Sequence, residues 1–156
     1  MKVAIVSGLT RRHVIGKGDA LPWRQIKDDL PNFKQLTENK TVIMGLNTYL
    51  SIGKPLPDRI NIIISREPAE IEGCVVCTSI PEALARAREY GKDTFIIGGA
   101  SIYEQMLPLV NTMHLSFIKK DYPGDKYFPK FSKAEWQQTA EKEFDEFTFV
   151  TLERKK

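Results

Sequence analysis

The sequence has few of the side chains that metal centres and disulfide frameworks require. Its 156 residues include two cysteines and two histidines. Cys74 and Cys77 form a single Cys-x-x-Cys, and neither His13 nor His114 lies near enough in sequence to complete a zinc set. On a strand, residues three apart point to opposite faces. We therefore expect no metal site, and two reduced structural cysteines on opposite faces of one strand.

Long apolar runs and long charged runs are also missing. No stretch approaches the length of a membrane-spanning helix, and residues 1–8 have too short an apolar core for a signal peptide. Lysine and arginine are scattered, and no basic segment carries the aromatic residues typical of nucleic-acid motifs. We expect a cytoplasmic monomer with no membrane, nucleic-acid or obligate protein partner.

Short β-branched apolar runs, by contrast, recur along the chain. They cover residues 2–7, 41–44, 60–65, 74–77, 94–98, 113–118 and 147–153. Most are continuous rather than alternating, which indicates strands buried on both faces. Helical patterns lie between them, at residues 28–37, 47–52, 81–90 and 101–107.

Alternating strands and helices predict an α/β fold in three layers: a central, mostly parallel twisted sheet with helices on both faces. The last two predicted strands are joined by residues 119–146, in which we predict only irregular structure. These two strands are therefore expected to pair antiparallel at one edge. Without repeats or a linker-like segment, residues 1–156 form one predicted domain.

Two strand ends run directly into glycine and then a helix start. Gly45 precedes Asn47 and Thr48, and Gly98-Gly99 precede the helix predicted at residues 101–107. Glycine lets a ligand approach the backbone, and a helix N-terminus offers unpaired N–H groups and positive dipole. One such motif indicates only a tight turn, but two favour a dinucleotide at the carboxyl ends of the strands. The segment GKGDAL lacks the third glycine of the Rossmann fingerprint.

Paired acids, Asp28 and Asp29, stand where the first helix begins. Helical spacing puts Asp29 in line with Phe33 and Leu36, on the apolar face, whereas Asp28 faces water and can cap the helix. An ionised group on an apolar face is costly without a partner, and no basic residue occupies that face. Asp29 is therefore the candidate site residue, with a cationic or amidine-like donor pair as its expected ligand.

A series of motifs resembles dihydrofolate reductase. They are VIGKGDALPW, the Asp-Leu-x-x-Phe-Lys of residues 29–34, TVIMGLNTYLSIGKPLPDR, NIIIS, FIIGGASIYEQ, GDKYFP and FTFVTLER, in order across nearly the whole chain. The resemblance implies hydride transfer from NADPH to C6 of 7,8-dihydrofolate, with protonation at N5, giving tetrahydrofolate for one-carbon metabolism. Asp29 matches the family's pterin-binding carboxylate, although one extra residue stands between Trp23 and Phe33.

The resemblance also implies the other catalytic and substrate-binding residues. Leu21 and Trp23 resemble the edge of the mobile active-site loop, to which Gly16, Gly18 and Ala20 give freedom to close. Arg59 matches the arginine that clamps the substrate's glutamate α-carboxylate, and diaminopyrimidine antifolates are expected to engage Asp29. The remaining positions that match the folate pocket are Val6, Ser7, Phe33, Lys34, Ser51, Ile52, Leu56, Ile97 and Ser116.

For NADPH the resemblance implies a set of turn and strand-end residues. Leu46 and Ser101 stand where the family often has basic residues, so Ser65 and Arg66 are expected to hold the 2′-phosphate. The full set is Ser7, Ile15, Gly16, Gly45, Asn47, Thr48, Ser65, Arg66, Ile97, Gly98, Gly99, Ala100, Ser101, Ile102 and Tyr103.

Two other functions fit parts of the sequence. The reductase domain of riboflavin biosynthesis resembles the same fold and uses NADPH, but it is not expected to pair Asp29 with the KPLPDR segment that carries Arg59. A catalytically silent nucleotide- or folate-binding module would bind NADPH tightly without turnover. Measuring turnover separates that module from an enzyme.

Overall fold

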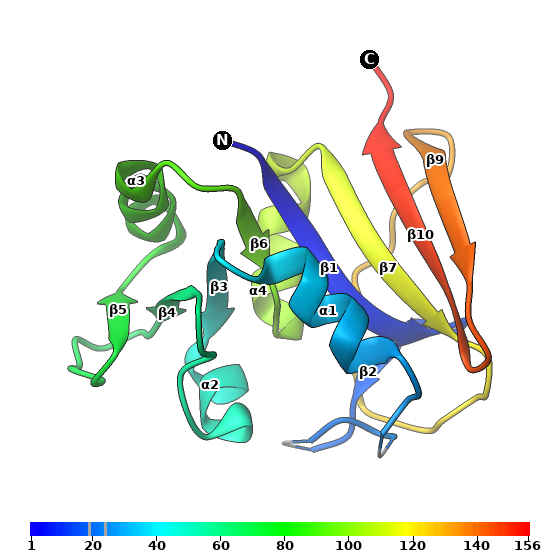
Figure 1. Ribbon diagram of the computed structural model, residues 1–156, viewed down its shortest axis with the longest axis horizontal. Coiled ribbons are helices and arrows are strands. Elements are labelled where there is room, and N and C mark those ends of the chain that lie inside the picture. The colour runs from blue at the N-terminus through cyan, green and yellow to red at the C-terminus, as the bar shows by residue number, and fades with distance from the viewer. Residues whose placement is uncertain (19, 24) are drawn as a thin grey trace.

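A sheet of eight strands organises the computed structural model, which describes residues 1–18, 20–23 and 25–156 (Figure 1). Its spatial order is β5 (Cys74–Cys77), β4 (Ile60–Ile64), β3 (Thr41–Gly45), β6 (Thr94–Ile96), β1 (Val3–Thr10), β7 (Thr112–Ile118), β10 (Phe147–Arg154) and β9 (Trp136–Glu143). Neighbours from β5 to β7 are parallel, whereas β10 pairs antiparallel with β7 and with β9. The predicted mostly parallel α/β sheet is confirmed.

In the part of the chain that the structure describes, four α-helices cover this sheet. They are α1 (Asp29–Thr37), α2 (Leu46–Ile52), α3 (Ile80–Tyr90) and α4 (Ala100–Met106), and a short 3-10 helix, η1 (Leu107–Leu109), follows α4. The best capped is α3, in which the Ser79 hydroxyl accepts from the Glu82 N–H, Pro81 stands in the first turn, and Gly91 ends the helix at φ 67°. None of the helices in the described part of the chain is long and apolar enough to cross a membrane.

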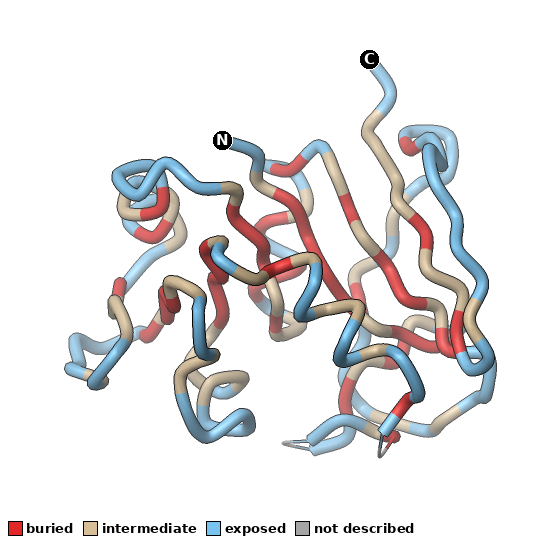
Figure 2. Tube along the Cα trace, viewed as in Figure 1, coloured by how far each residue is buried: buried red, intermediate tan, exposed pale blue. Residues whose placement is uncertain are grey.

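The helices lie in two layers, with α1 and α2 in front of the sheet and α4 behind it in Figure 1. On the α1 and α2 side, Phe33, Leu36 and Tyr49 pack against a cluster that includes Val6 and Met44. The other face carries the larger cluster, in which residues of α3 and α4 cover the central strands. Burial is concentrated along these strands (Figure 2). The expected three-layer arrangement is therefore observed.

The strand β9 was not predicted. Only Trp136 of its eight residues is buried, and the other seven are exposed. Apolar periodicity cannot reveal such a strand, because its side chains face water and its pairing with β10 rests on backbone hydrogen bonds. The irregular connection expected at residues 119–146 was therefore wrong. The antiparallel pairing of the last two predicted strands is confirmed, but β9 rather than β10 forms the sheet edge.

Two further features lie away from the centre of the main sheet. The short strands β2 (Val14–Gly16) and β8 (Lys126–Tyr127) pair antiparallel outside the main sheet. In β5, Cys74 packs with the cluster beneath α1 and α2, whereas Cys77 is buried in the cluster beneath α3 and α4. Both are free thiols on opposite faces of one strand, as their spacing predicts.

Candidate active site

The two aspartates at the start of α1 have different surroundings. Asp29 is the first residue of the helix and is half-buried, whereas Asp28 is exposed. The expectation that Asp28 caps the helix with its side chain was wrong, because no such hydrogen bond forms. A capping residue normally has extended backbone, but Asp28 has φ 70°. Helical phase therefore predicts correctly which acid faces inward, but the side-chain cap expected at Asp28 is absent.

The Asp29 carboxylate lies against two neighbouring strands. Ser116 of β7 is buried and hydrogen-bonds to it. In the sheet, Ser116 is paired with Gly8 of β1, and a Cβ placed on Gly8 would lie 4.0 Å from Asp29 Oδ2 and 3.4 Å from Trp23 Cζ2. The absent side chain of Gly8 thus leaves space beside the carboxylate and the indole.

The electrostatics of Asp29 fit a ligand site. Within the described residues, Asp29 makes no ion pair with a lysine, arginine or histidine. Burial raises the pKa of its carboxyl above the ordinary value, and the hydrogen bond from Ser116 opposes that shift. A half-buried carboxylate with one hydroxyl partner retains acceptor capacity for a donor pair on a ligand.

The loop beside Asp29 is held by a second loop. Trp23 is buried, with its ring centroid 5.8 Å from that of Tyr122, whereas Leu21 is 59% exposed. The Gly18 N–H donates to Asp125 Oδ1 at 2.9 Å, and the Asp125 N–H donates to the Gly16 carbonyl at 3.0 Å. Asp125 belongs to the motif GDKYFP but was not predicted as a site residue. It fastens the segment expected to form the active-site loop.

The predicted carboxylate clamp, Arg59, lies beside the other end of α1. Arg59 donates through Nε to the Pro57 carbonyl at 2.9 Å and through Nη1 to Thr37 Oγ1 at 3.1 Å. Its guanidinium carbon lies 5.9 Å from the centroid of the Phe33 ring. Thr37, to which Arg59 donates, is the last residue of α1, and Asp29 is the first. The Arg59 guanidinium and the Asp29 carboxylate therefore lie at opposite ends of a helix roughly 12 Å long. This spacing suits an elongated ligand with a donor ring at one end and a carboxylate at the other.

The two predicted glycine turns lie together in the structure. The Gly45 N–H, before α2, donates to the Gly98 carbonyl, before α4, at 2.9 Å. A Cβ on Gly99 would lie 3.3 Å from Thr48 Oγ1, and neither helix has a side-chain cap. The first-turn N–H groups of both helices are therefore available to an anionic ligand. This arrangement fits the phosphates of a dinucleotide.

Tyr103 connects the second turn to the central strand. Its hydroxyl donates to the Val6 carbonyl at 2.7 Å and also contacts the Ser7 hydroxyl. Burial raises the pKa of Tyr103 well above its ordinary value, so the phenol stays neutral. The hydroxyl thus fixes α4 against β1 at the point where Val6 and Ser7 were expected to meet substrate and cofactor.

The remaining predicted residues occupy several elements around these groups. Ser65, at the end of β4, is buried, and Arg66 beside it is exposed. Ile97 is half-buried, and its N–H donates to the Ile43 carbonyl at 2.9 Å. The others lie on β2 (Ile15, Gly16), on α1 (Lys34), on α2 (Asn47, Ser51, Ile52), in the loop after α2 (Leu56) and on α4 (Ala100, Ser101, Ile102). Ser51 and Ile52 are exposed at the end of α2.

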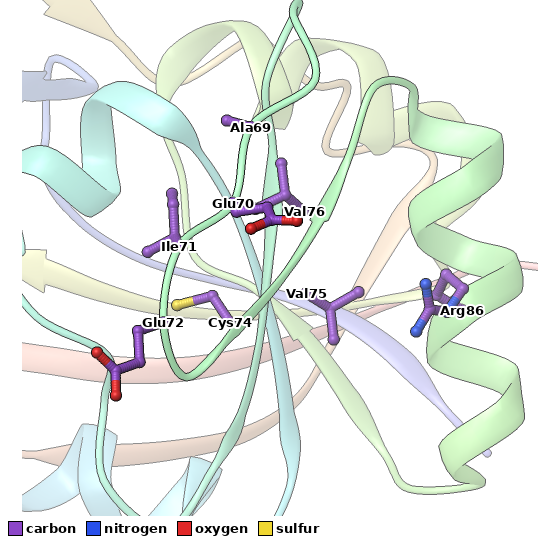
Figure 3. Close-up of a pocket in the computed structure, with 8 residues that line it drawn as sticks. All are labelled: Ala69, Glu70, Ile71, Glu72, Cys74, Val75, Val76 and Arg86. Carbon is purple, nitrogen blue, oxygen red and sulfur yellow. The ribbon is translucent and has the colours of Figure 1, made fainter.

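The described residues contain no group of three His, Cys, Asp or Glu side chains placed to hold a metal ion. A cavity of about 610 Å³ lies along the edge strand β5, lined by Ala69, Glu70, Ile71, Glu72, Cys74, Val75, Val76 and Arg86 (Figure 3). None of the predicted site residues lines this cavity, so it is separate from the site around Asp29.

Several known proteins are similar to this chain in sequence and in structure. A family model described as dihydrofolate reductase matches residues 2–154. Dihydrofolate reductases from Bacillus subtilis and Haemophilus influenzae are 31% and 37% identical, with 98% and 94% of this chain and 95% and 88% of those proteins covered. A dihydrofolate reductase from Enterococcus faecalis complexed with NADP(H) and RAB-propyl has a TM-score of 0.91 at 29% identity, over 99% of this chain and 97% of that one.

The fold and the site first define a class. A mostly parallel sheet, two glycine turns at its strand ends and an inward-facing carboxylate are the parts of an α/β enzyme that holds an elongated ligand beside a nucleotide. The comparisons then give the family: the chain belongs to the dihydrofolate reductases.

Proposed function

We propose that the protein reduces 7,8-dihydrofolate to tetrahydrofolate, with hydride added at C6 and a proton at N5. The observation that carries the proposal is the half-buried Asp29 carboxylate, which has Ser116 as a hydrogen-bond partner and no cation beside it among the described residues. An ionised aspartate can accept two parallel hydrogen bonds from the amino group and adjacent N–H of a pterin ring. Asp29 thereby orients the ring for protonation at N5, and the proton arrives through water.

The other residues of the proposed site bind and enclose the substrate. Phe33 and Leu56 supply apolar surface, and Arg59 clamps the carboxylate of the substrate's tail, because the hydrogen bonds to Pro57 and Thr37 hold its guanidinium in place. Trp23 and Leu21 limit the access of water to the pterin. Diaminopyrimidine antifolates, which carry a similar donor pair, are proposed to bind the same carboxylate.

NADPH is the proposed cofactor, and it supplies the hydride when bound. The turns at Gly45 and Gly98-Gly99 offer the backbone N–H groups that its phosphates require, and the small residues leave room for close approach. Tyr103 keeps the second turn in place through Val6. We propose that the protein works as a single-domain cytoplasmic monomer with no obligate protein partner.

The direct test is NADPH oxidation followed spectroscopically after addition of dihydrofolate to the purified protein. The proposal predicts turnover and formation of tetrahydrofolate. NADPH binding without turnover would instead indicate a silent binding module.

Arg66→Ala tests the proposed 2′-phosphate site. Arg66 is exposed beside the buried Ser65, and loss of a charged hydrogen-bond donor there should reduce the preference for NADPH over NADH roughly tenfold or more. Steady-state kinetics with both cofactors measures that preference. Arg88→Ala removes an equal charge from the exposed face of α3 and serves as the control. An unchanged preference in Arg66→Ala would show that the phosphate is held elsewhere.

Glu146→Ala tests a contact that positions the start of α1. Glu146 lies in the turn between β9 and β10, and its carboxylate accepts a hydrogen bond from the Lys27 N–H at 2.5 Å. Lys27 stands two residues before Asp29. Its loss should let Asp29 shift and raise KM for dihydrofolate roughly threefold to tenfold, with a smaller change in kcat.

Asp145→Ala is the matched control for this contact. Among the described residues, Asp145 forms an exposed ion pair with Lys27 alone, 3.0 Å between charged atoms, and such pairs stabilise little. Equal effects of the two substitutions on KM would mean that the ion pair, rather than the backbone hydrogen bond, positions the helix.

A further inference from the structure

One side of the edge strand β5 is left without a neighbouring strand. β5 is the last strand of the main sheet, and among the described residues it pairs with β4 alone. The cavity of about 610 Å³ lies along its other side, with the loop that leads into β5 on one flank and Arg86 of α3 on the other (Figure 3). This cavity and the free backbone edge of β5 are here named the β5 groove. Its volume is in the range of ligand-binding sites.

Backbone groups of β5 point into this groove. Successive residues of a strand direct their N–H and C=O groups to alternate sides. The Cys77 carbonyl accepts from the Ser65 N–H, at the end of β4, at 2.8 Å, so the backbone groups of Val76 point away from β4. The Cys74 N–H donates to the Ile71 carbonyl at 3.0 Å. In the described part of the chain, the Val76 N–H and the carbonyls of Val76 and Cys74 have no hydrogen-bond partner outside the ladder with β4.

The two edges of the main sheet differ in how well they are protected. At the far edge, β9 has a register shift in its pairing with β10, and its exposed side chains include Glu141 and Lys142. Bulges and charged side chains discourage the addition of another strand. β5 consists of two cysteines and two valines, and it pairs with β4 in regular register. Such an apolar, regular edge accepts an extended segment.

The charges of the groove favour a basic partner. Glu70 and Glu72 lie on the loop side of β5, and Arg86 lies on the α3 side (Figure 3). Arg86 already pairs with Glu89, 3.1 Å between charged atoms. Within residues 1–18, 20–23 and 25–156, neither Glu70 nor Glu72 has a cationic nitrogen within 4.0 Å. Carboxylates that lack a cation beside an apolar edge attract lysine or arginine side chains.

A second copy of this chain fits the groove poorly. Antiparallel pairing of β5 with its own copy is isologous, so each copy would bring the same side chains to the interface. The Glu70 and Glu72 carboxylates of both copies would then gather at one interface, where the Arg86 side chains are already paired with Glu89. Like charges brought together in this way oppose association.

We propose that the β5 groove binds an extended basic segment of another polypeptide, which adds to β5 as a further strand. Hydrogen bonds to the Val76 N–H and to the carbonyls of Val76 and Cys74 hold its backbone. Its apolar side chains cover the half-buried valines of β5, and its lysine or arginine side chains approach Glu70 and Glu72. This binding is separate from the proposed reduction of dihydrofolate, because no proposed site residue lines the groove.

The probe is the blocked peptide acetyl-Lys-Val-Thr-Val-Lys-amide, titrated into the isotope-labelled full-length protein. Amide NMR signals of Val76 and its neighbours are expected to shift, with a Kd of roughly 0.1–1 mM at low salt, since few hydrogen bonds and two exposed ion pairs form. The charge-reversed peptide acetyl-Glu-Val-Thr-Val-Glu-amide should bind roughly tenfold more weakly or worse.

Peptides with N-methylated backbones test strand addition on the unaltered protein. One peptide is methylated at the threonine, and another at both valines. In an added strand, alternate N–H groups face β5 and the rest face water. One of the two peptides should therefore lose binding, whereas the other should keep a Kd within about twofold of the parent.

Variants of the protein test the same contacts from the other side. Val76→Pro removes the N–H that points into the groove and leaves the ladder with β4, because an edge strand accepts proline where its N–H faces outward. It should lose binding. Glu70→Gln with Glu72→Gln should weaken binding roughly threefold to tenfold at low salt. The control, Glu104→Gln with Glu141→Gln, removes the same charge from exposed positions outside the groove and should bind as the wild type does.

Several results would overturn the proposal. One is a set of NMR shifts that lies away from β5, and another is equal affinity for the parent and the charge-reversed peptides. Equal binding of both N-methylated peptides would exclude strand addition, and this result does not depend on whether Val76→Pro folds. Sedimentation equilibrium supplies the last: a wild-type dimer that Val76→Pro converts to monomer would mean that a second copy occupies the groove.

Discussion

Asp29→Asn is expected to reduce the turnover of dihydrofolate by roughly a hundredfold to ten-thousandfold near neutral pH. Asparagine keeps the shape of the side chain, but it offers one acceptor oxygen and a competing NH₂ donor where the carboxylate offers two acceptors. The pterin then loses one of its paired hydrogen bonds and meets a donor in its place. NADPH oxidation in the wild type and the variant, followed spectroscopically, measures the loss.

Asp28→Asn is the control for that substitution. It removes the same charge one residue away, from a side chain that is exposed and makes no cap hydrogen bond. Its turnover should stay close to that of the wild type. The reverse pattern, with Asp28→Asn inactive and Asp29→Asn active, would show that the register of the resemblance is wrong by one residue.

The choice between these two acids could be made from sequence because it depends on local geometry. A helix has a fixed period, so Phe33 and Leu36 determine which side of α1 is apolar, and Asp29 shares that side. The cap at Asp28 depends instead on the backbone at a single residue, whose φ of 70° no periodicity indicates. Local periodicity thus predicts which side of a helix a residue occupies, but it does not predict the conformation at the helix end.

Contacts between distant segments were the least predictable part of the site. Gly8 leaves room beside Asp29 only because β1 and β7 are neighbours in a particular register. Thr37 holds Arg59 across 22 residues, and Asp125 holds Gly18 across 107. A glycine in a strand can mark a place where another group comes close to the backbone. Which residues come close to Gly8 is determined by the order and register of the strands. The family resemblance supplied candidate residues, whereas the structure supplied the contacts that position them.

Asp29→Asn should also stabilise the protein while it reduces activity. Burial raises the pKa of the Asp29 carboxyl in the folded state, so the folded protein binds this proton more tightly than the unfolded chain does. As pH rises from the ordinary aspartate pKa of about 3.9 through the raised value, the unfolded chain has the lower proton occupancy, and the free energy of unfolding falls. At neutral pH the folded wild type therefore carries the full cost of a half-buried charge.

The stability measurement is thermal unfolding of the wild type, Asp29→Asn and Asp28→Asn across the acid to neutral range, without ligands. Asp29→Asn should have the higher Tm at neutral pH, by roughly 2–4 °C for each 1 kcal/mol of removed cost, and should lack the part of the pH dependence that Asp29 contributes. Asp28→Asn should behave as the wild type. A lower Tm in Asp29→Asn would mean that the carboxylate stabilises the fold through Ser116, and that a ligand is not needed to explain an acid at this position.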